Sequence, residues 1–294
     1  MKEAVWVVGC AGLVGKEMVK FVQEKGISCI GSTSEQVDVT DIESIRSFCK
    51  KHRPTHIINC SAHVHVDQAE KEERELAFAV NVTGVENLAE IAKEQGVHLI
   101  HIGTDYVFDG EKDSQYSETD EVNPINIYGL TKLQGEQRML EIYPSAVCVR
   151  TASLYGKEKP GLVTYMIKAL ETQDEVLAIV DQVSTPTYVT CLVRAIWDIR
   201  NEKGIFHFVN KGHASRLDLA RELMKHAETA GKKIKCTRLI GVKDRDSGRA
   251  AKRPHRSVLS TKKIEPYLSQ PILSWQAALS QYLKEIGWDK RGIS

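Results

Sequence analysis

An alternation of short β-rich runs with longer helical patterns in the first half of the chain is the strongest constraint on its fold. Five runs are typical of strands: Val5–Val8, Ile27–Ile30, His56–Asn59, His98–Ile102 and Ala146–Arg150. Four segments between them have helical periodicity: Leu13–Glu24, Asp41–Lys51, Glu72–Glu94 and Ile127–Ile142. Strands that alternate with helices form βαβ units, and their crossovers place helices on both faces of a parallel sheet. We therefore predict an α/β fold with a doubly wound parallel sheet.

The first predicted strand runs into a glycine-rich turn with the spacing G-x-x-G-x-x-G. Its residues are Gly9, Ala11, Gly12, Leu13, Val14 and Gly15. Glycines allow a tight turn and a close approach of the backbone to a pyrophosphate, which the next helix meets with free N–H groups. The alternative is an ordinary turn that happens to hold three glycines. In the strand–turn–helix context we interpret the motif as the NAD(P) site of a Rossmann-type domain.

The end of the second predicted strand bears on the choice between NADH and NADPH. A carboxylate about 20 residues after the glycines usually binds the adenine ribose of NAD. Here Ser32, Thr33 and Ser34 stand at that place, with neither a carboxylate nor an arginine among them. Their hydroxyls can bind a 2′-phosphate, so NADPH is tolerated and the cofactor is either NADPH or NADH.

After Arg150 the alternation loosens, which indicates a second unit. The elements expected there are helices at Gly161–Leu170, Val189–Ile199, Ser215–Ala230 and Trp275–Ile286, and a strand at Ile205–Val209. A chain of 294 residues exceeds the usual size of one domain. We expect an NAD(P)-binding domain over residues 1–156, to which the chain returns around 188–210. Residues 157–187 and 211–294 then form a smaller α/β substrate-binding domain.

Composition excludes several other classes of protein. The formal net charge is +1, so no global field favours nucleic acid or an anionic membrane. The first apolar run, Ala4–Val8, is too short for a signal segment or a membrane span. The seven cysteines are scattered and odd in number, with no metal-binding spacing. We expect a cytoplasmic protein with reduced thiols, no metal site, and no nucleic-acid or membrane partner.

Tyr128 and Lys132 are the first candidates for catalysis. They stand at positions i and i+4 of a predicted helix, so they share one face. A phenol has a pKa of about 10, and a nearby cation is expected to lower it. Such a phenol can give a proton to the alkoxide that forms when hydride reaches a carbonyl carbon. The alternative is a surface tyrosine–lysine pair, which the upstream glycine turn disfavours.

Two further segments complete the candidate site. Thr104 directly follows the fourth strand, at the edge where parallel sheets bind ligands, and its hydroxyl can bond the substrate oxygen. The polar residues after it, Asp105, Tyr106 and Asp109, are alternatively a well-ordered turn. Asn81 interrupts a regular helical pattern, so it has either a structural or proton-relay role or a place on a solvated face.

Taken together, these segments resemble the dTDP-4-dehydrorhamnose reductase family of extended short-chain dehydrogenases. Matching pieces run in consistent order from Gly9–Gly15 to Lys252–Leu259, and the phrase Thr104–Gly110 is the most specific. The resemblance implies reduction of a 4-keto-6-deoxy sugar nucleotide at C4 by NAD(P)H, in the synthesis of a cell-surface polysaccharide precursor. It implies Thr104, Tyr128 and Lys132 as the catalytic residues.

The resemblance also assigns binding residues. It implies cofactor contacts by the glycine turn, by the catalytic tyrosine and lysine, and by Ser32, Asp38, Val39, Ser61, Ala62 and Asn81. It implies substrate contacts by Thr104, Asp105, Tyr106, Ser153 and Arg253, the last near the nucleotide diphosphate. A homodimer is left open as the assembly.

Four positions depart from the family pattern. Ser153 stands where the family usually has tryptophan, and Arg216 where an aromatic residue is common. His63 replaces a tyrosine and Ser184 a glycine. Loss of two aromatic side chains changes the shape of the sugar pocket, so the sequence leaves the sugar open.

Three functions therefore compete. The first is a dTDP-4-dehydrorhamnose reductase or a reductase of another keto sugar nucleotide. The second is a non-catalytic NADP-binding regulatory subunit, like that of methionine adenosyltransferase, against which the retained Thr104, Tyr128 and Lys132 argue. The third is an epimerase or dehydratase. For a dehydratase, Asp-Glu would be expected where this chain has Asp105-Tyr106.

Overall fold

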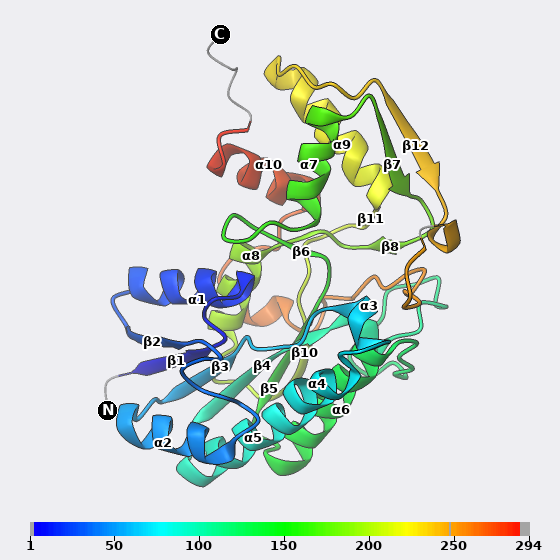
Figure 1. Cartoon of the computed structure of the whole chain (residues 1–294). Helices are drawn as coiled ribbons and strands as arrows, with labels where there is room; N and C mark the ends of the chain where they lie inside the picture. Colours follow the sequence, from blue (N-terminus) through cyan, green and yellow to red (C-terminus); the bar gives the residue numbers. More distant parts are fainter. Residues whose placement is uncertain (1–2, 247, 289–294) are drawn as a thin grey trace.

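The computed structural model describes residues 3–246 and 248–288, so the outer ends of the expected domains, residues 1 and 294, lie outside it. Figure 1 shows a larger lobe, with the sheet between layers of helices, and a smaller lobe above it that holds α7 (Leu162–Thr172), α9 (Arg216–Ala230) and α10 (Trp275–Glu285). The sheet has the order β10-β5-β4-β3-β1-β2, and every neighbouring pair is parallel. Its strands are β1 (Ala4–Val8), β2 (Ser28–Ser32), β3 (His56–Asn59), β4 (His98–Thr104), β5 (Val147–Thr151) and β10 (Gly204–His207).

Alternate residues of β1 enter two different hydrophobic clusters, which explains why helices cover both faces. Val5 and Val7 pack in one cluster with residues of α1 and α8, whereas Trp6 and Val8 pack in another with residues of α2 and α5. This is the two-residue period of a strand that is buried on both faces. The helices are α1 (Leu13–Glu24), α2 (Ile42–His52), α5 (Gly84–Gln95), α6 (Ile127–Ile142) and α8 (Val189–Asp198). The predicted doubly wound α/β fold is confirmed.

The strand order places the ends of β1 and β3 at a topological switch point. The chain passes from β1 to β2 on one side and to β3 on the other, so a crevice opens beyond their carboxyl ends. Gly9 follows β1 with φ of 74°. A Cβ atom there would lie 2.8 Å from the Ser61 nitrogen, so the turn needs glycine both for its backbone angle and for its space.

The helix expected over Glu72–Glu94 is divided by a wide turn. It consists of α4 (Arg74–Phe78), a π-helical turn η1 (Ala79–Thr83) and α5, and is preceded by the short α3 (Val66–Ala69). The π-helical turn lies against α6, where a Cβ atom on Gly135 would come within 1.9 Å of the Asn81 carbonyl oxygen. Propensity does not reveal this bulge, because tertiary packing against α6 accompanies it.

The smaller lobe combines three helices that the periodicity predicted with short strands that it did not reveal. Helices α7 and α9 pack against a parallel pair, β7 (Glu175–Ile179) and β12 (Arg238–Val242). Helix α10 belongs to the same lobe. Two-residue strands form two more pairs: β6 (Leu154–Tyr155) with β9 (Thr187–Tyr188), and β8 (Val183–Ser184) with β11 (Ala214–Ser215). Short 3₁₀ turns lie at η2 (Asp105–Val107), η3 (Asp244–Asp246) and η4 (Glu265–Tyr267).

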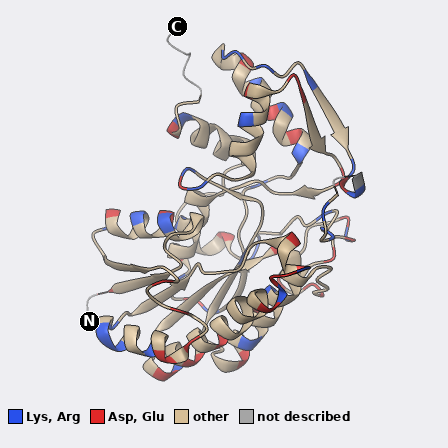
Figure 2. Ribbon diagram, viewed as in Figure 1, with Lys and Arg blue, Asp and Glu red and all other residues tan. Residues whose placement is uncertain are grey.

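One hydrophobic cluster joins the two lobes. It runs from Val5 and Val147 of the sheet, through Leu192 of α8, to Leu223 of α9 and Leu279 of α10. Acidic and basic residues are interspersed along the helices that cover the sheet (Figure 2). Among the described residues, no helix combines the length and the apolar character that crossing a membrane would need.

Candidate active site

The glycine turn forms one wall of a cavity beside the switch point, which we call the turn cavity. Gly9, Ala11 and Gly12 line it on one side, and Ser61 and Ala62, which follow β3, line it on the other. Gly12 is the N-cap of α1, without a side-chain cap, and the first turn of α1 carries no acidic residue. The free N–H groups and the positive end of the helix dipole therefore fit the diphosphate of a dinucleotide.

The far end of the turn cavity departs from the sequence expectation at one residue. Asp38 and Val39 line it, as do Thr33 and Ser34. The expected ligand Ser32 does not, because it is fully buried and its hydroxyl accepts a hydrogen bond from Trp6 Nε1 at 2.9 Å. The expectation that Ser32 contacts the cofactor is therefore wrong, because the alternation of side chains along β2 directs Ser32 into the core.

Lys159, which no sequence motif singles out, also lines the turn cavity. It lies in the loop between β6 and α7. Among the described residues, it is the only lysine that lines this cavity. A lysine in a glycine- and proline-flanked loop carries no periodic signal, so only its position in space identifies it. Its ammonium group adds a local positive charge to a cavity whose other charged lining residues are Asp38 and Glu73.

Asn81 is buried, and it lines neither the turn cavity nor the cavity that holds Tyr128 and Lys132. Its side chain accepts a hydrogen bond from the His63 backbone nitrogen at 2.9 Å and donates to the His63 carbonyl oxygen at 3.1 Å. It also donates to the Thr131 hydroxyl at 3.0 Å. The residue thus ties the loop after β3 to α6, which carries the tyrosine and lysine.

Tyr128, Lys132 and Thr104 meet in a second cavity, which we call the tyrosine cavity. Val14 of the glycine-turn motif and Ser61 line the same cavity. Asn126 caps α6 by accepting a hydrogen bond from Gly129 at 2.7 Å, so the tyrosine lies in the first turn of the helix. The structure thus brings the three predicted catalytic residues together next to the turn cavity.

The pKa of Tyr128 is raised, contrary to the sequence expectation. Burial disfavours the phenolate, and a hydrogen bond with the Thr104 hydroxyl only partly opposes that effect. Lys132 is not among the groups that shift this pKa, and its amine contacts His101 and the Ile102 carbonyl oxygen. Tyr128 therefore keeps its proton at neutral pH, and it is the protonated phenol that a reduction requires.

Lys132 is held by a buried chain of hydrogen bonds that begins at the loop after β3. The Ser61 backbone nitrogen donates to Asn59 Oδ1 at 3.0 Å, so the Asn59 amide nitrogen faces His101 Nδ1, also at 3.0 Å. Lys132 Nζ lies 2.9 Å from His101 Nε2 and donates to the Ile102 carbonyl oxygen at 2.7 Å. A histidine between the apolar Ile100 and Ile102 of β4 was the sequence signal for this chain, and it was missed.

The direction of these bonds disfavours the charged form of Lys132. Burial lowers the pKa of His101 well below its usual value, so the ring is neutral. Its Nδ1 accepts from Asn59, which leaves the ring proton on Nε2, facing Lys132. Burial also disfavours the ammonium form of Lys132 and lowers its pKa to about 8.

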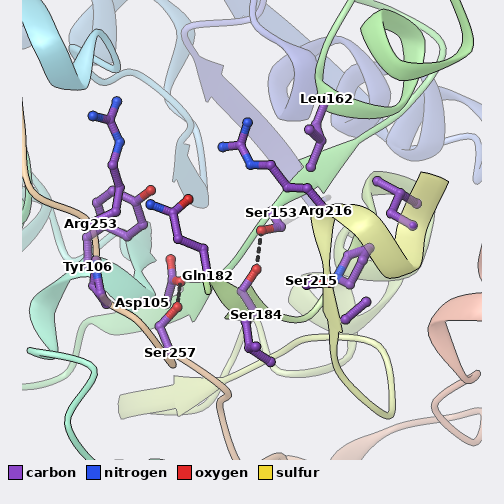
Figure 3. A pocket seen from close by; sticks show the side chains of 15 residues that line it. Asp105, Tyr106, Ser153, Leu162, Gln182, Ser184, Ser215, Arg216, Arg253 and Ser257 are labelled. Atoms are coloured by element: carbon purple, nitrogen blue, oxygen red, sulfur yellow. Dashed lines mark hydrogen bonds between the residues drawn. The ribbon is translucent and has the colours of Figure 1, made fainter. Parts of the chain in front are cut away.

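A third hollow, which we call the arginine pocket, opens beyond the tyrosine cavity. Asp105, Tyr106, Ser153 and Arg216 line both, and Arg253 lines the arginine pocket alone (Figure 3). Burial raises the pKa of Asp105 to about 6, although hydrogen bonds from Ser257 and Thr104 oppose this effect. The Ser257 hydroxyl donates to Asp105 Oδ2 at 2.5 Å.

Two predicted substrate residues have specific local geometry. Ser153 has φ of 45°, a left-handed conformation that side chains other than glycine rarely adopt, and its hydroxyl lies 2.5 Å from that of Ser184. Such conformations concentrate at functional sites. Arg253 donates to both carboxylate oxygens of Asp67, at 2.8 and 2.6 Å. Its charge is therefore partly neutralised within the protein.

Comparison with known proteins places these residues in a family. The family described as RmlD substrate binding domain matches residues 1–287. The chain belongs to this family. A dTDP-4-dehydrorhamnose reductase from Mycolicibacterium smegmatis is 38% identical over 284 residues, which are 95% of this chain and 84% of that protein. The resemblance inferred from the motifs is confirmed.

Two further relatives support the same conclusion. A dTDP-4-keto-6-deoxy-D-glucose reductase from Streptomyces niveus is 32% identical over 94% of this chain and 95% of its own length. The crystal structure of a dTDP-4-dehydrorhamnose reductase from Bacillus anthracis in complex with NADP has a TM-score of 0.91. It is 31% identical and matches 97% of this chain and 100% of that chain. The protein is thus a member of a family of reductases, and the roles of its individual residues remain predictions.

Proposed function

We propose that this protein reduces the C4 ketone of a 4-keto-6-deoxy sugar nucleotide of the dTDP-4-dehydrorhamnose type, using NADPH or NADH. The product is a precursor of cell-surface polysaccharide. The observation that carries the proposal is the position of the protonated Tyr128 and of Thr104 in a cavity between the glycine turn and the arginine pocket. Relatives with this name support the substrate class.

The chain's own residues account for binding and proton transfer. A bound nicotinamide supplies the hydride. Gly9, Gly12 and the start of α1 hold the cofactor diphosphate, and Lys132 orients the ribose beside the nicotinamide. The Tyr128 phenol then donates its proton to the oxygen that becomes negative, while the Thr104 hydroxyl bonds the same oxygen.

The turn cavity accommodates either cofactor. No carboxylate stands at the end of β2 to repel a 2′-phosphate, and the Thr33 and Ser34 hydroxyls can bond one. Lys159 supplies a positive charge in the same cavity. These features support use of NADPH, and the absence of an arginine at β2 leaves NADH as an alternative cofactor.

The remaining parts of the proposal concern the setting of the reaction. We place the protein in the cytoplasm, which its seven free cysteines support, and we assign it no nucleic-acid partner, which its net charge of +1 supports. Residues 1–156 with 188–210 are proposed as the cofactor domain, and 157–187 with 211–294 as the substrate domain. A homodimer belongs to the same proposal, and sedimentation of the full chain tests it.

A spectrophotometric assay tests the proposed activity. Purified protein is mixed with NADPH or NADH and one of several 4-keto-6-deoxy sugar nucleotides, and loss of the nicotinamide absorbance is followed. We expect turnover with at least one keto sugar nucleotide, and none with the corresponding 4-hydroxy sugar nucleotide. Tight NADPH binding without turnover of any keto sugar would refute the reductase proposal and favour a regulatory subunit.

A further inference from the structure

Arg216 lies at the junction of two cavities and has no hydrogen-bond or ion-pair partner among the described residues. It is the first residue of α9 and lines both the tyrosine cavity and the arginine pocket (Figure 3). Arg253 is bonded to Asp67, and Arg249 to Gln182 and Asp244, so the two arginines that act on Arg216 have partners of their own.

The surroundings of Arg216 are unfavourable to its charge. It is only partly exposed, and the positive charges of Arg249 and Arg253 act on it. Tyr106 and, more weakly, Asp244 oppose that effect. Burial and these like charges lower the pKa of Arg216 below its usual value, although the group stays protonated. A guanidinium kept without an acidic partner in such a place destabilises the fold, and this is typical of a binding group that a ligand completes.

The position of Arg216 relative to Tyr128 limits where the ligand group lies. A ketone whose oxygen faces Tyr128 and Thr104 occupies the tyrosine cavity, and the adjoining arginine pocket is a hollow into which the substrate can extend. Ser153 and Leu162 line both hollows beside Arg216, so this arginine lies at the passage between them. A substrate group beside Arg216 is therefore either attached to the reacting sugar or a substituent of the sugar itself.

We propose that Arg216 binds an anionic oxygen group of the substrate at the passage between the two cavities, and thereby selects substrates with negative charge next to the reacting sugar. Two parts of a sugar nucleotide carry this chemistry: the diphosphate attached to the sugar, and a carboxylate on the sugar itself. A planar guanidinium can bond either group in a bidentate manner. This inference rests on the proposed function for the substrate class, but not for the presence of an anion site.

Binding measurements with Arg216→Gln separate the two sources of the anion. Titration calorimetry of the NADP-loaded protein with dTDP alone reports the diphosphate. Parallel titrations with sugar nucleotides that differ by a carboxylate on the sugar report the second source. Loss of one charged hydrogen-bonded contact weakens affinity by about ten- to a hundredfold. Weaker dTDP binding assigns the diphosphate, and weaker binding of only the carboxylated sugar nucleotide assigns the sugar.

Arg221→Gln is the matched control, because Arg221 lies on the same helix but is exposed and pairs with Asp218 at 3.4 Å. It should leave every affinity unchanged. Thermal unfolding of Arg216→Gln should give a Tm equal to or above that of the wild type, since no internal partner is lost. Unchanged affinity for all three ligands in Arg216→Gln, with the Tm preserved, would overturn the proposal. Because these readouts are affinities, they do not depend on whether the protein turns over a ketone.

Discussion

At the scale of the residue, the phenol of Tyr128 is the group on which turnover depends. Its burial keeps the proton on the oxygen, and Thr104 lies within hydrogen-bonding range of it. The phenol is therefore in the protonated form from which proton transfer to a reduced ketone starts, although its raised pKa makes it a weaker acid than a free tyrosine. Substitutions at this position should thus affect the chemical step more than the binding of either ligand.

Tyr128→Phe removes the proton donor but keeps the aromatic ring that packs against Tyr106, with centroids 5.7 Å apart. We expect kcat to fall by about 10²- to 10⁴-fold, the usual contribution of a positioned acid, with NADPH affinity retained. Steady-state kinetics and fluorescence titration of NADPH measure the two effects. Tyr267→Phe, at an exposed tyrosine, serves as the control. A Tyr128→Phe enzyme with wild-type kcat would show that another group donates the proton.

Lys132 gives a pH-dependent stability that can be isolated by substitution. The folded protein releases the Lys132 proton near pH 8, whereas the unfolded chain holds it to about pH 10.5. Raising the pH from 8 to 10.5 therefore stabilises the folded state through this group, and below pH 8 the full penalty of burying the ammonium applies. The free energy of unfolding of Lys132→Met, relative to wild type, should fall across that interval.

Urea unfolding of both proteins at several pH values measures this difference. Lys225→Met, at an exposed lysine of α9, should give a difference that does not change over the same interval. A constant difference for Lys132→Met as well would mean that the buried amine titrates as it does in the unfolded chain.

At the scale of the element, the regular helices and strands of the larger lobe were predictable, but the features that shape the site were not. The α1 and α6 bounds, Leu13–Glu24 and Ile127–Ile142, match the expectation because apolar periodicity and end signals agree there. The π-helical turn at Ala79–Thr83 and the rotation of Ser32 into the core depend on packing partners far away in the sequence. Single-sequence patterns contain no record of such partners.

The β7–β12 pair was missed for a different reason. Val176 and Ala178 are buried while Leu177 is exposed, so β7 alternates in burial but not in polarity. A polarity pattern therefore shows no strand there. The catalytic trio was more accessible to prediction, since Thr104, Tyr128 and Lys132 lie at places that strand ends and helical spacing already specify.

Gly135→Ala tests the close packing of α6 against the π-helical turn. The new methyl group would lie within 1.9 Å of the Asn81 carbonyl oxygen, so the two helices must separate. Overpacking of this kind costs about 1–3 kcal/mol, whereas an alanine in an open helix position would stabilise. Thermal unfolding should give a lower Tm for Gly135→Ala and little change for Gln137→Ala, an exposed position on the same helix. A Tm for Gly135→Ala at or above the wild type would contradict this contact.

At the scale of the whole molecule, cofactor binding should raise the stability of both lobes together. NADPH at a hundredfold excess over its Kd stabilises the folded state by about 2.7 kcal/mol. Because one hydrophobic cluster runs from Val147 of β5 to Leu279 of α10, we expect a single unfolding transition that shifts upward as a unit. Differential scanning calorimetry measures it, with adenosine alone as the control ligand. Two separate transitions, of which only one responds to NADPH, would contradict the shared core.

The same cluster also bears on how ligands enter the molecule. A rotation of the smaller lobe away from the sheet would expose Leu192, Leu223 and their apolar neighbours to water, and this penalty grows with every square ångström uncovered. Large hinge opening is therefore disfavoured, and we expect the lobes to keep a nearly constant relative orientation through the catalytic cycle. Access then depends on local movement of surface loops such as residues 156–161, so the entry and exit of ligands are governed by the loop rather than by the lobes.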